Sequence, residues 1–355
     1  MEKIRVGVIG CGGIANGKHL PALKNVKEVE MVAFCDIIEE RAVEAAKKYG
    51  TPDAKVYTDY KELLKDESIV TVHVCTPNRS HSFISIDAME AGKHVMCEKP
   101  MAKTYAEAKA MYETSVRTGK LLTIGYQSRW RDDALYLKQC CENGELGDVY
   151  YARAIALRRR AVPTWGVFLN EYEQGGGPLI DLGVHMIDLA IWLMGSPKPV
   201  TVTGSTYCKF ADSDTSDSVN SDFGDKVSGG TFDVEDLAMG TIRFDNGAQL
   251  QIEFSWASNI KQENRFVELR GTKSGLTWRD GDVEVFTEMH GQGCDIHPSN
   301  LQPEKKEHVL NLINFYDVVI DGKEPVFKPQ QGIDMIKILC AIYKSAETGR
   351  EVVLD

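Results

Sequence analysis

The N-terminal segment places a hydrophobic strand directly before a glycine-rich turn. Residues 3–9 are rich in Val and Ile, which is typical of a strand buried on both faces of a parallel sheet. Gly10, Gly12 and Ala15 follow and form the G-x-G-x-x-G/A pattern of dinucleotide-binding turns. Small residues there permit a tight turn, leave room for a pyrophosphate and let the next helix lie close to the strand. The phosphates would bind the free N–H groups at the start of that helix.

A second strand predicts which cofactor this turn binds. Residues 31–36 form a hydrophobic run that ends at Asp36, 26 residues after Gly10. A carboxylate in this place accepts hydrogen bonds from a ribose diol and repels a 2′-phosphate, and Ile37 adds no positive charge. We therefore expect NAD rather than NADP. The contacts expected at this end of the chain are Gly10, Gly12, Gly13, Ile14 and Asp36.

Strand and helix patterns alternate through the first third of the chain, which predicts a doubly wound parallel sheet. Strands are expected at residues 3–9, 31–36, 55–58, 69–75, 94–97 and 121–125, and helices at 38–49, 59–65, 80–91 and 104–118. Ligands of such sheets collect at the carboxyl ends of the strands. Residues 1–125 are therefore predicted to form an α/β Rossmann domain that binds NAD(P).

The pattern changes after residue 126 to alternating, half-buried strands. These are expected at residues 149–157, 200–210, 237–244, 248–257 and 266–270, with a hairpin turn at residues 245–247 (Asp-Asn-Gly). Residues 211–230 are rich in Ser, Asp and Gly and predict a loop, and the last helix is expected over 332–348. We predict that residues 126–355 form an α+β domain with a large, open, mostly antiparallel sheet, for substrate binding and oligomerisation.

A helix predicted over residues 178–194 carries candidates for acid–base chemistry. Asp181 and His185 are four residues apart and would share one face of an α-helix. A neutral imidazole can remove an alcohol proton near neutral pH, and a nearby carboxylate can orient the ring or hold a substrate hydroxyl. In the alternative interpretation, Asp181 stabilises the helix N-terminus and His185 is a hydrogen-bonded core residue. The residues alone leave both open.

Lys99 is a second candidate because it directly follows the fifth predicted strand. An ammonium there could bind a substrate hydroxyl and stabilise the alkoxide that forms as hydride leaves. Glu98 would then be its counter-ion or a cofactor contact. Alternatively the two residues form a surface pair in a turn set by Pro100, whose preceding peptide bond could be cis or trans.

Residues 158–166 precede the predicted catalytic helix and are candidates to cover a substrate. Arg158 could contact it, and Trp165 could stack on a sugar or nicotinamide face. Three consecutive arginines, residues 158–160, cannot all point in one direction, so at least one is expected in solvent.

Four ordered motifs resemble the Gfo/Idh/MocA oxidoreductases, the family of glucose–fructose oxidoreductase and inositol dehydrogenase. They are Gly10-x-Gly12-x-x-Ala15, Thr76-Pro77-Asn78-x-x-His81, Glu98-Lys99-Pro100 and Asp181-x-x-x-His185. The resemblance runs through the whole chain to the C-terminal helix. One departure is Tyr126-Gln127, where many members have an aromatic residue followed by Asn.

The resemblance implies NAD(P)-linked oxidation or reduction of a secondary alcohol or ketone on a sugar or cyclitol. It implies that Lys99, Asp181 and His185 surround the reacting carbon, with His185 as general acid/base. It also implies a set of cofactor-lining residues: Thr76, Pro77, Asn78, His81, Glu98, Lys99 and Gln127. The second domain's open sheet implies a homodimer or homotetramer.

Two other functional classes remain open. Some relatives of this fold keep NAD bound and hydrolyse glycosidic bonds through transient oxidation, which predicts turnover of an aryl glycoside without net NADH. A non-catalytic dinucleotide-binding sensor is the third class, and the presence of Lys99, Asp181 and His185 together disfavours it.

Composition limits the partners and the compartment. The net charge of −11 argues against nucleic acid and anionic membranes as partners, and 43% hydrophobic with 26% charged residues is typical of a soluble globular protein. No transmembrane span or signal peptide is expected. Nine cysteines without paired spacing favour reduced thiols in the cytoplasm. No metal site is predicted, since His290 and His297 lack convincing ligand partners.

Overall fold

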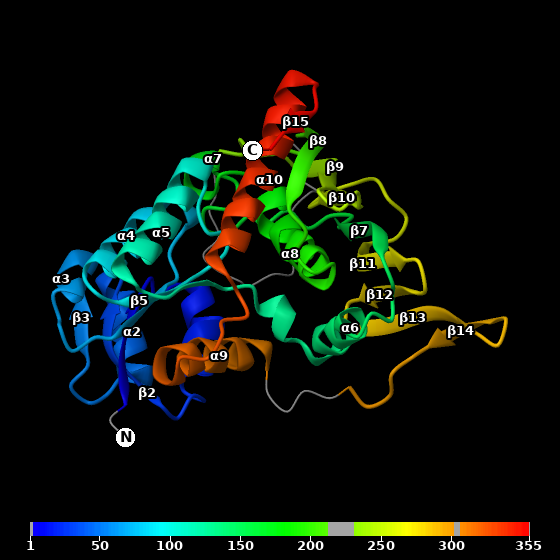
Figure 1. Cartoon of the computed structure of the whole chain (residues 1–355). Helices are drawn as coiled ribbons and strands as arrows, with labels where there is room; N and C mark the ends of the chain where they lie inside the picture. The colour runs from blue at the N-terminus through cyan, green and yellow to red at the C-terminus, as the bar shows by residue number, and fades with distance from the viewer. Residues whose placement is uncertain (1–2, 212–230, 302–305, 355) are drawn as a thin grey trace. The chain divides into compact units, whose positions relative to one another are not determined.

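The computed structural model describes residues 3–211, 231–301 and 306–354, which form two compact units (Figure 1). The first comprises Met1–Gln127 and Lys305–Ile336, and the second comprises Ser128–Glu304 and Lys337–Asp355. This differs from the sequence-based division into 1–125 and 126–355 in one C-terminal segment. That segment contains helix α9 (Glu307–Asp321), whose hydrophobic face packs into the core of the first unit.

The first unit is built on a six-stranded parallel sheet, which confirms the predicted doubly wound fold. Its strand order is β3-β2-β1-β4-β5-β6, the Rossmann order. The strands are β1 (Ile4–Ile9), β2 (Val29–Cys35), β3 (Lys55–Tyr57), β4 (Thr71–Val74), β5 (His94–Cys97) and β6 (Leu122–Ile124). All six lie within or close to the segments predicted from hydrophobic patterning.

Four helices of this unit begin near the predicted residues: α2 (Glu39–Tyr49), α3 (Tyr60–Leu64), α4 (His81–Glu90) and α5 (Tyr105–Thr118). The unit also contains α1 (Leu20–Leu23), after the glycine-rich turn, and α9, which was not predicted. The capping box expected at the start of α5 is present, because Thr104 Oγ1 accepts from the Glu107 N–H at 3.3 Å. In return a Glu107 carboxylate oxygen accepts from the Thr104 N–H at 2.9 Å.

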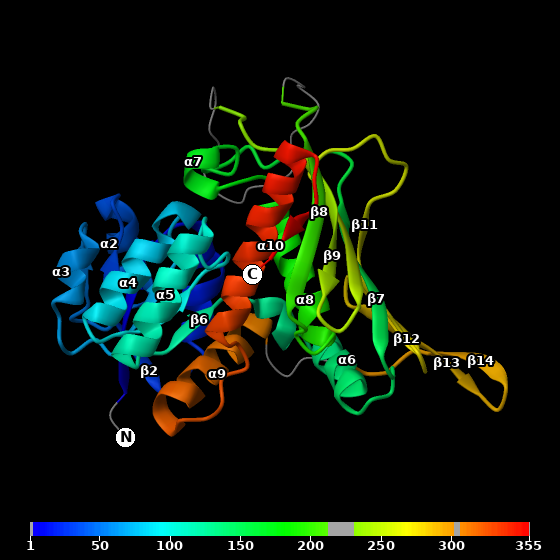
Figure 2. The same ribbon diagram turned by 45° about the horizontal axis from the view of Figure 1, so that its top comes forward.

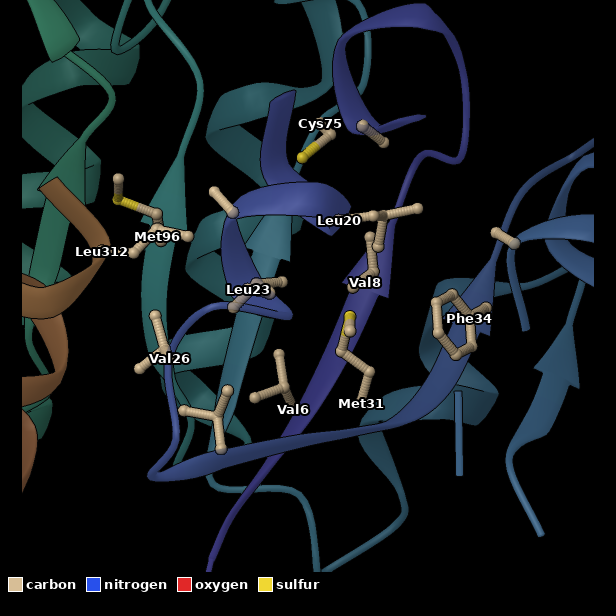
Figure 3. Packing of buried hydrophobic residues seen from close by; sticks show 14 of the residues in the cluster. Val6, Val8, Leu20, Leu23, Val26, Met31, Phe34, Cys75, Met96 and Leu312 are labelled. Carbon is tan, nitrogen blue, oxygen red and sulfur yellow. The ribbon is translucent and has the colours of Figure 1, made fainter. Parts of the chain in front are cut away.

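One large hydrophobic cluster joins the sheet to helices from both ends of the chain (Figure 3). Val6 and Val8 of β1 and Leu20 of α1 have no exposed surface, and Leu312 of α9 belongs to the same cluster. Helix α9 therefore completes the core of the first unit.

The second unit contains a nine-stranded sheet (Figure 2). Its order is β14-β13-β12-β11-β7-β10-β9-β8-β15, and β7 with β10 is the single parallel pair among these described strands. The strands are β7 (Val149–Leu157), β8 (Pro199–Tyr207), β9 (Leu237–Phe244), β10 (Gln249–Ser255), β11 (Asn264–Gly271), β12 (Gly275–Arg279), β13 (Asp282–Met289), β14 (Gln292–Ile296) and β15 (Val352–Val353). The mostly antiparallel sheet and the β9–β10 hairpin are confirmed.

The helices of this unit include a π-helical turn that the sequence did not predict. The unit contains α6 (Asp132–Glu142), α7 (Glu171–Gln174), the π-turn η4 (Leu179–Gly183), α8 (Val184–Leu193) and the C-terminal part of α10 (Pro329–Thr348). The Val184 N–H donates to the Leu179 carbonyl, five residues earlier. A π-turn adds a residue to the helical turn, so the α-helical spacing rule does not fix how Asp181 and His185 are related.

The stretch Glu171–Leu193 is long and apolar enough for a membrane span by length and composition. In the structure 78% of its most apolar window is buried, which is the environment of a core helix. The loop predicted at 211–230 lies, apart from Ala211, outside the described residues.

Candidate active site

The glycine-rich turn has the backbone geometry that a dinucleotide requires. Gly10 has φ +89°, and a Cβ on it would lie 2.6 Å from the Cys75 carbonyl oxygen, so no larger residue fits. A Cβ on Gly12 would point into open space, which leaves that side of the turn accessible to a ligand. Gly13 and Ile14 continue the turn into the helical segment that begins at Ala15.

Asp36 fastens this turn to the end of β2. Its Oδ2 accepts from the Cys11 N–H at 2.8 Å, and its Oδ1 accepts from the Ile38 N–H at 2.9 Å. The carboxylate is buried, and the neighbouring Ile37 side chain is 90% exposed and carries no charge. Each carboxylate oxygen retains a further lone pair, so the residue can still accept from a ribose hydroxyl. The turn and Asp36 therefore fit NAD.

The cysteines around this turn are inert thiols. All nine cysteines of the chain are free. Burial, followed by the nearby Asp36 charge, raises the pKa of Cys35 to about 12 and that of Cys11 further still. Thiols of this kind do not act as nucleophiles at neutral pH.

His81 holds two strand ends together. The ring is fully buried, with Nε2 2.8 Å from the Thr76 carbonyl oxygen and Nδ1 2.8 Å from the Pro100 carbonyl oxygen. A neutral imidazole has one N–H and can donate to one of these carbonyls at a time. Burial lowers the pKa of His81 and so disfavours the doubly protonated ring. The contacts of His81 position the segment that contains Thr76, Pro77 and Asn78.

The Glu98-Lys99-Pro100 motif lies at the carboxyl end of β5. Glu98 is 7% exposed, and its Oε2 accepts from the Lys99 backbone N–H at 3.2 Å. The peptide bond between Lys99 and Pro100 is cis, which settles the alternative left open by the sequence. The Glu98 charge lies close to the Lys99 ammonium, which is one cause of the low pKa of Glu98.

A small pocket opens beside Glu98. Its polar lining includes Glu98, Gln127, His19 and His308, and Gly125 lies next to the Glu98 carboxylate. Gln127, predicted to contact the cofactor, therefore lies in the same part of the first unit as Glu98 and Lys99.

In the second unit, Asp181 and His185 are half-buried residues on the segment formed by η4 and α8. The Trp256 indole N–H donates to Asp181 Oδ2 at 3.0 Å, and the Trp256 side chain is fully buried. The carboxylate is thus held in one orientation by a rigid donor.

Glu235 holds the start of the same segment. Its carboxylate, 7% exposed, accepts from the N–H groups of Gly177 at 2.8 Å and Leu179 at 3.1 Å, and from the Tyr343 hydroxyl at 3.0 Å. Burial raises the pKa of Glu235, and these hydrogen bonds oppose that rise. A carboxylate at this end also interacts favourably with the helix dipole.

Asp188, on α8 three residues after His185, is a structural residue. It is 3% exposed and forms a two-point ion pair with Arg129, with N–O distances of 2.9 and 2.6 Å. Burial raises the pKa of Asp188, and the Arg129 charge opposes that shift. Its oxygens are occupied by the guanidinium.

The predicted substrate-covering segment is only partly buried. Arg158 donates to the Ala161 carbonyl at 3.5 Å, and Trp165 makes an edge-to-face contact with Phe168 at 6.1 Å between ring centroids. Arg159 is exposed, which confirms that at least one of the three arginines lies in solvent. Arg160 lies over the Phe210 ring at 4.5 Å. None of these contacts assigns Arg158 or Trp165 to a substrate.

Among the described residues, no group of three or more His, Cys, Asp or Glu side chains is placed to hold a metal ion. His297 forms an exposed ion pair with Glu284 at 3.2 Å.

Four side chains that support the site were not identified from the sequence: His19, His73, Glu235 and Trp256. His19 lies four residues after Ala15, and Glu235 lies outside the four motifs. His73 is on β4 and Trp256 directly follows β10, and in such hydrophobic runs a single residue gives no signal of what it faces. Lys99 belongs to the first unit, and Asp181 and His185 belong to the second.

Two family models match the chain. One is described as an oxidoreductase family with an NAD-binding Rossmann fold and matches residues 4–126. The other is described as the C-terminal alpha/beta domain of that family and matches residues 138–354. Together they cover both units.

Full-length relatives are named dehydrogenases. D-glucoside 3-dehydrogenase of Escherichia coli (strain K12) is 36% identical over 352 residues, which are 99% of this chain and 97% of the relative. Myo-inositol 2-dehydrogenase of Thermotoga maritima is 28% identical over 356 residues, 99% of each chain.

Solved structures share the fold. GenD2 from gentamicin A biosynthesis, in complex with NAD, has a TM-score of 0.79 and 26% identity, over 100% of this chain and 97% of that one. Levoglucosan dehydrogenase in complex with NADH and levoglucosan has a TM-score of 0.83 at 23% identity, over 99% of each chain. The chain therefore belongs to the Gfo/Idh/MocA family of NAD-binding oxidoreductases, which act on sugars and cyclitols.

Proposed function

We propose that this protein is an NAD-dependent dehydrogenase that oxidises one secondary hydroxyl of a sugar or cyclitol, or reduces the matching ketone. The observation that carries the proposal is the η4–α8 segment, in which Asp181 and His185 share a helix anchored by Glu235 and Trp256. Glu235 fixes the start of this segment and Trp256 fixes the Asp181 carboxylate, so the half-buried Asp and His lie on a firmly held element, as positioned catalytic groups require. The relative named D-glucoside 3-dehydrogenase makes a glucoside the first substrate to test.

In the proposed mechanism His185 is the general acid/base and takes the hydroxyl proton during oxidation. The Lys99 ammonium stabilises the oxygen as negative charge develops on it. Asp181 orients His185 or holds a neighbouring substrate hydroxyl, with its own orientation set by Trp256. Arg158 and Trp165 are proposed as further substrate contacts, and Trp165 offers an aromatic face to a sugar ring.

The first unit is proposed to hold NAD through its strand ends. Gly10, Gly12, Gly13 and Ile14 would receive the pyrophosphate, and Asp36 a ribose diol, which favours NAD over NADP. The remaining cofactor contacts are proposed for Thr76, Pro77, Asn78, His81, Glu98, Lys99 and Gln127. For His81 that role is indirect, because its ring nitrogens face backbone carbonyls. When bound, NAD supplies the hydride acceptor.

We further propose that the protein works in the cytoplasm as a homodimer or homotetramer that assembles through the nine-stranded sheet. Nine free cysteines support a reducing compartment. Small sugars or cyclitols are its only proposed partners apart from its own copies.

The experiment is a spectrophotometric screen of methyl glucosides, inositols and anhydrosugars with NAD and with NADP. We expect NADH formation with at least one polyol and slower turnover with NADP, because Asp36 repels a 2′-phosphate. Activity with NADP alone would contradict the role of Asp36. Release of a free sugar from an aryl glycoside without net NADH would favour the hydrolase alternative.

A further inference from the structure

A chain of buried polar side chains runs from Glu98 into the core of the first unit. Glu98 Oε1 lies 2.6 Å from His19 Nε2, and His19 Nδ1 lies 3.1 Å from His73 Nδ1. His73 Nε2 lies 2.9 Å from the Tyr316 hydroxyl, which lies 3.3 Å from Thr71 Oγ1. The five side chains are between 0 and 7% exposed. We call this set the Glu98–Thr71 relay.

With Glu98 ionised, two proton arrangements satisfy the hydrogen bonds of the relay. A third, in which a protonated Glu98 donates to a neutral His19, is disfavoured because the Lys99 backbone N–H and the Lys99 charge both favour an ionised Glu98. In the first, His19 carries two N–H groups and donates to both Glu98 and His73, and His73 donates to Tyr316. In the second, His19 is neutral and accepts at Nδ1 from His73, so His73 accepts at Nε2 from the Tyr316 hydroxyl and both of these hydrogen bonds are reversed. The two differ by one proton, and therefore by one positive charge on His19.

The burial of Glu98 decides between them. An ionised carboxylate in a buried site requires a nearby positive charge and hydrogen-bond donors. The 2.6 Å distance to His19 is shorter than an ordinary neutral N–H to oxygen bond of about 2.9 Å, which favours a charge-assisted pair. A neutral His19 would leave Lys99 as the main compensating charge.

The electrostatics of each ring agree with the charged arrangement. Burial opposes protonation of His19, but the interaction with Cys75, by charge and by hydrogen bond, and then the hydrogen bond and charge of Glu98 raise its pKa well above the usual range. Burial and the His19 charge keep the pKa of His73 well below the usual range. Burial raises the pKa of Glu98, and the hydrogen bond and charge of His19 outweigh it and lower that pKa to about 2.

We propose that His19 is a positioning residue that stays protonated and holds Glu98 as an ionised, fixed acceptor for the cofactor beside Lys99. His19 binds Glu98 Oε1, while Oε2 receives the Lys99 backbone N–H. Glu98 therefore cannot rotate or take up a proton without breaking a buried ion pair. This inference rests on the proposed function, because it takes Glu98 as part of the cofactor site.

Other charged or titratable groups face the His19–Glu98 pair from each neighbouring element. Cys75 follows β4, Lys99 follows β5, and His308 lies at the start of α9. His308 is itself paired with Glu307 at 3.4 Å, which lowers the pKa of Glu307 to about 2. Since the α9 pair carries its own counter-charge, His19 and Lys99 remain as the principal cations at Glu98.

Imidazole proton–nitrogen NMR of the ¹⁵N-labelled full chain tests the charge without any cofactor. At about pH 8 we expect one histidine with both ring nitrogens protonated, identified as His19 by its loss in His19→Gln. In Glu98→Gln, the His19 signal should become that of a neutral ring. This second measurement tests the proposal even if the His19→Gln variant does not fold. A neutral His19 that titrates in the ordinary range would overturn the proposal.

Fluorescence titration with NADH tests the role of the pair. We expect His19→Gln to weaken NADH binding about tenfold near neutral pH, and progressively more as the pH falls and Glu98 is protonated. Wild-type affinity should stay nearly constant over the same range. His94→Gln is the matched control, because His94 accepts a backbone hydrogen bond from Leu121 at the opposite end of β5 and should bind NADH as wild type does.

A double substitution shows whether His19 acts through Glu98. If it does, His19→Gln with Glu98→Gln should bind NADH no more weakly than Glu98→Gln alone. If the double variant loses NADH affinity by the product of the two single losses, the proposal is overturned. Wild-type NADH affinity in His19→Gln at every pH would overturn it as well. A wild-type protein that binds no NADH would overturn the proposed function and the role of Glu98 with it, whereas a neutral His19 in an NADH-binding protein would overturn this inference alone.

Discussion

At the scale of single residues, the candidate catalytic groups depend on rigid buried partners. Asp181 accepts a hydrogen bond from the indole N–H of the fully buried Trp256, and a Glu98 carboxylate oxygen lies 2.6 Å from a ring nitrogen of the buried His19. In each case a side chain with few rotamers fixes a carboxylate that is predicted to meet substrate or cofactor. Such partners determine the orientation of a reacting group although they do not touch the reacting atoms.

Trp256→Phe removes the donor to Asp181 while keeping an aromatic ring in the core. A hydrogen bond to a charged group contributes about 1.5–3 kcal/mol, so we expect kcat/KM to fall about tenfold or more, together with a lower Tm from the lost hydrogen bond and the smaller core side chain. Steady-state kinetics and thermal unfolding measure the two effects. Trp278→Phe is the control, since Trp278 is equally buried and its indole N–H has no hydrogen-bond partner among the described residues. Equal losses of activity in the two variants would contradict the role of Trp256.

At the scale of secondary-structure elements, the η4–α8 segment is organised from its N-terminal end. Glu235 accepts the free N–H groups that begin the segment, and Tyr343 of α10 donates to the same carboxylate. The π-turn lies between this anchor and His185. π-turns are frequent at functional sites, where they change the direction of a side chain. Glu235 therefore fixes the start of the segment that carries Asp181 and His185.

Glu235→Gln replaces a carboxylate acceptor by an amide and leaves at least one buried N–H or hydroxyl poorly paired. We expect a loss of about 1–3 kcal/mol in the free energy of unfolding, together with a lower kcat. Chemical denaturation measures the free energy of unfolding, and steady-state kinetics measure kcat. The control is Glu253→Gln, a half-buried carboxylate on β10. A stable but inactive Glu235→Gln would indicate a direct catalytic role instead of an anchoring one.

Hydrophobic patterning and turn chemistry predicted most of these elements but not the residues that support the site. The six parallel strands and the β9–β10 hairpin follow from local periodicity, which is a short-range signal. The π-turn, the Arg129–Asp188 pair and the Trp256–Asp181 hydrogen bond depend on tertiary contacts that join distant positions. The candidates Asp181 and His185 followed from helical spacing and Lys99 from its place after a strand, and motif resemblance then implied their joint role; neither signal shows what holds these residues.

At the scale of the whole molecule, the chain crosses between its two units more than once. After the second unit's sheet it returns to the first unit as α9 and then ends in the second. Phe315 and Tyr316 of α9 are 1% exposed within the same cluster as β1 and α1. The stability of the first unit therefore depends on residues more than 300 positions from its first strand.

Phe315→Ala tests this dependence. Truncation of a fully buried Phe costs about 3–5 kcal/mol, so we expect faster hydrogen exchange in β1, β4 and α1 than in the strands of the second unit. Hydrogen exchange of the full chain, followed by mass spectrometry of its peptides, measures the protection of each unit separately. Phe254→Ala, a fully buried residue of β10, should show the reverse distribution. Uniform loss of protection in both units after either substitution would show that they unfold together.

Direct transfer of hydrogen to the nicotinamide is the central claim, and isotope transfer tests it. The wild-type protein is incubated with NAD and a glucoside or inositol that carries deuterium on every ring carbon, and the NADH formed is weighed by mass spectrometry. We predict NADH that is one mass unit heavier, formed about 10²–10⁴-fold more slowly by His185→Ala. Unlabelled NADH, or product release with no NADH at all, would contradict the account.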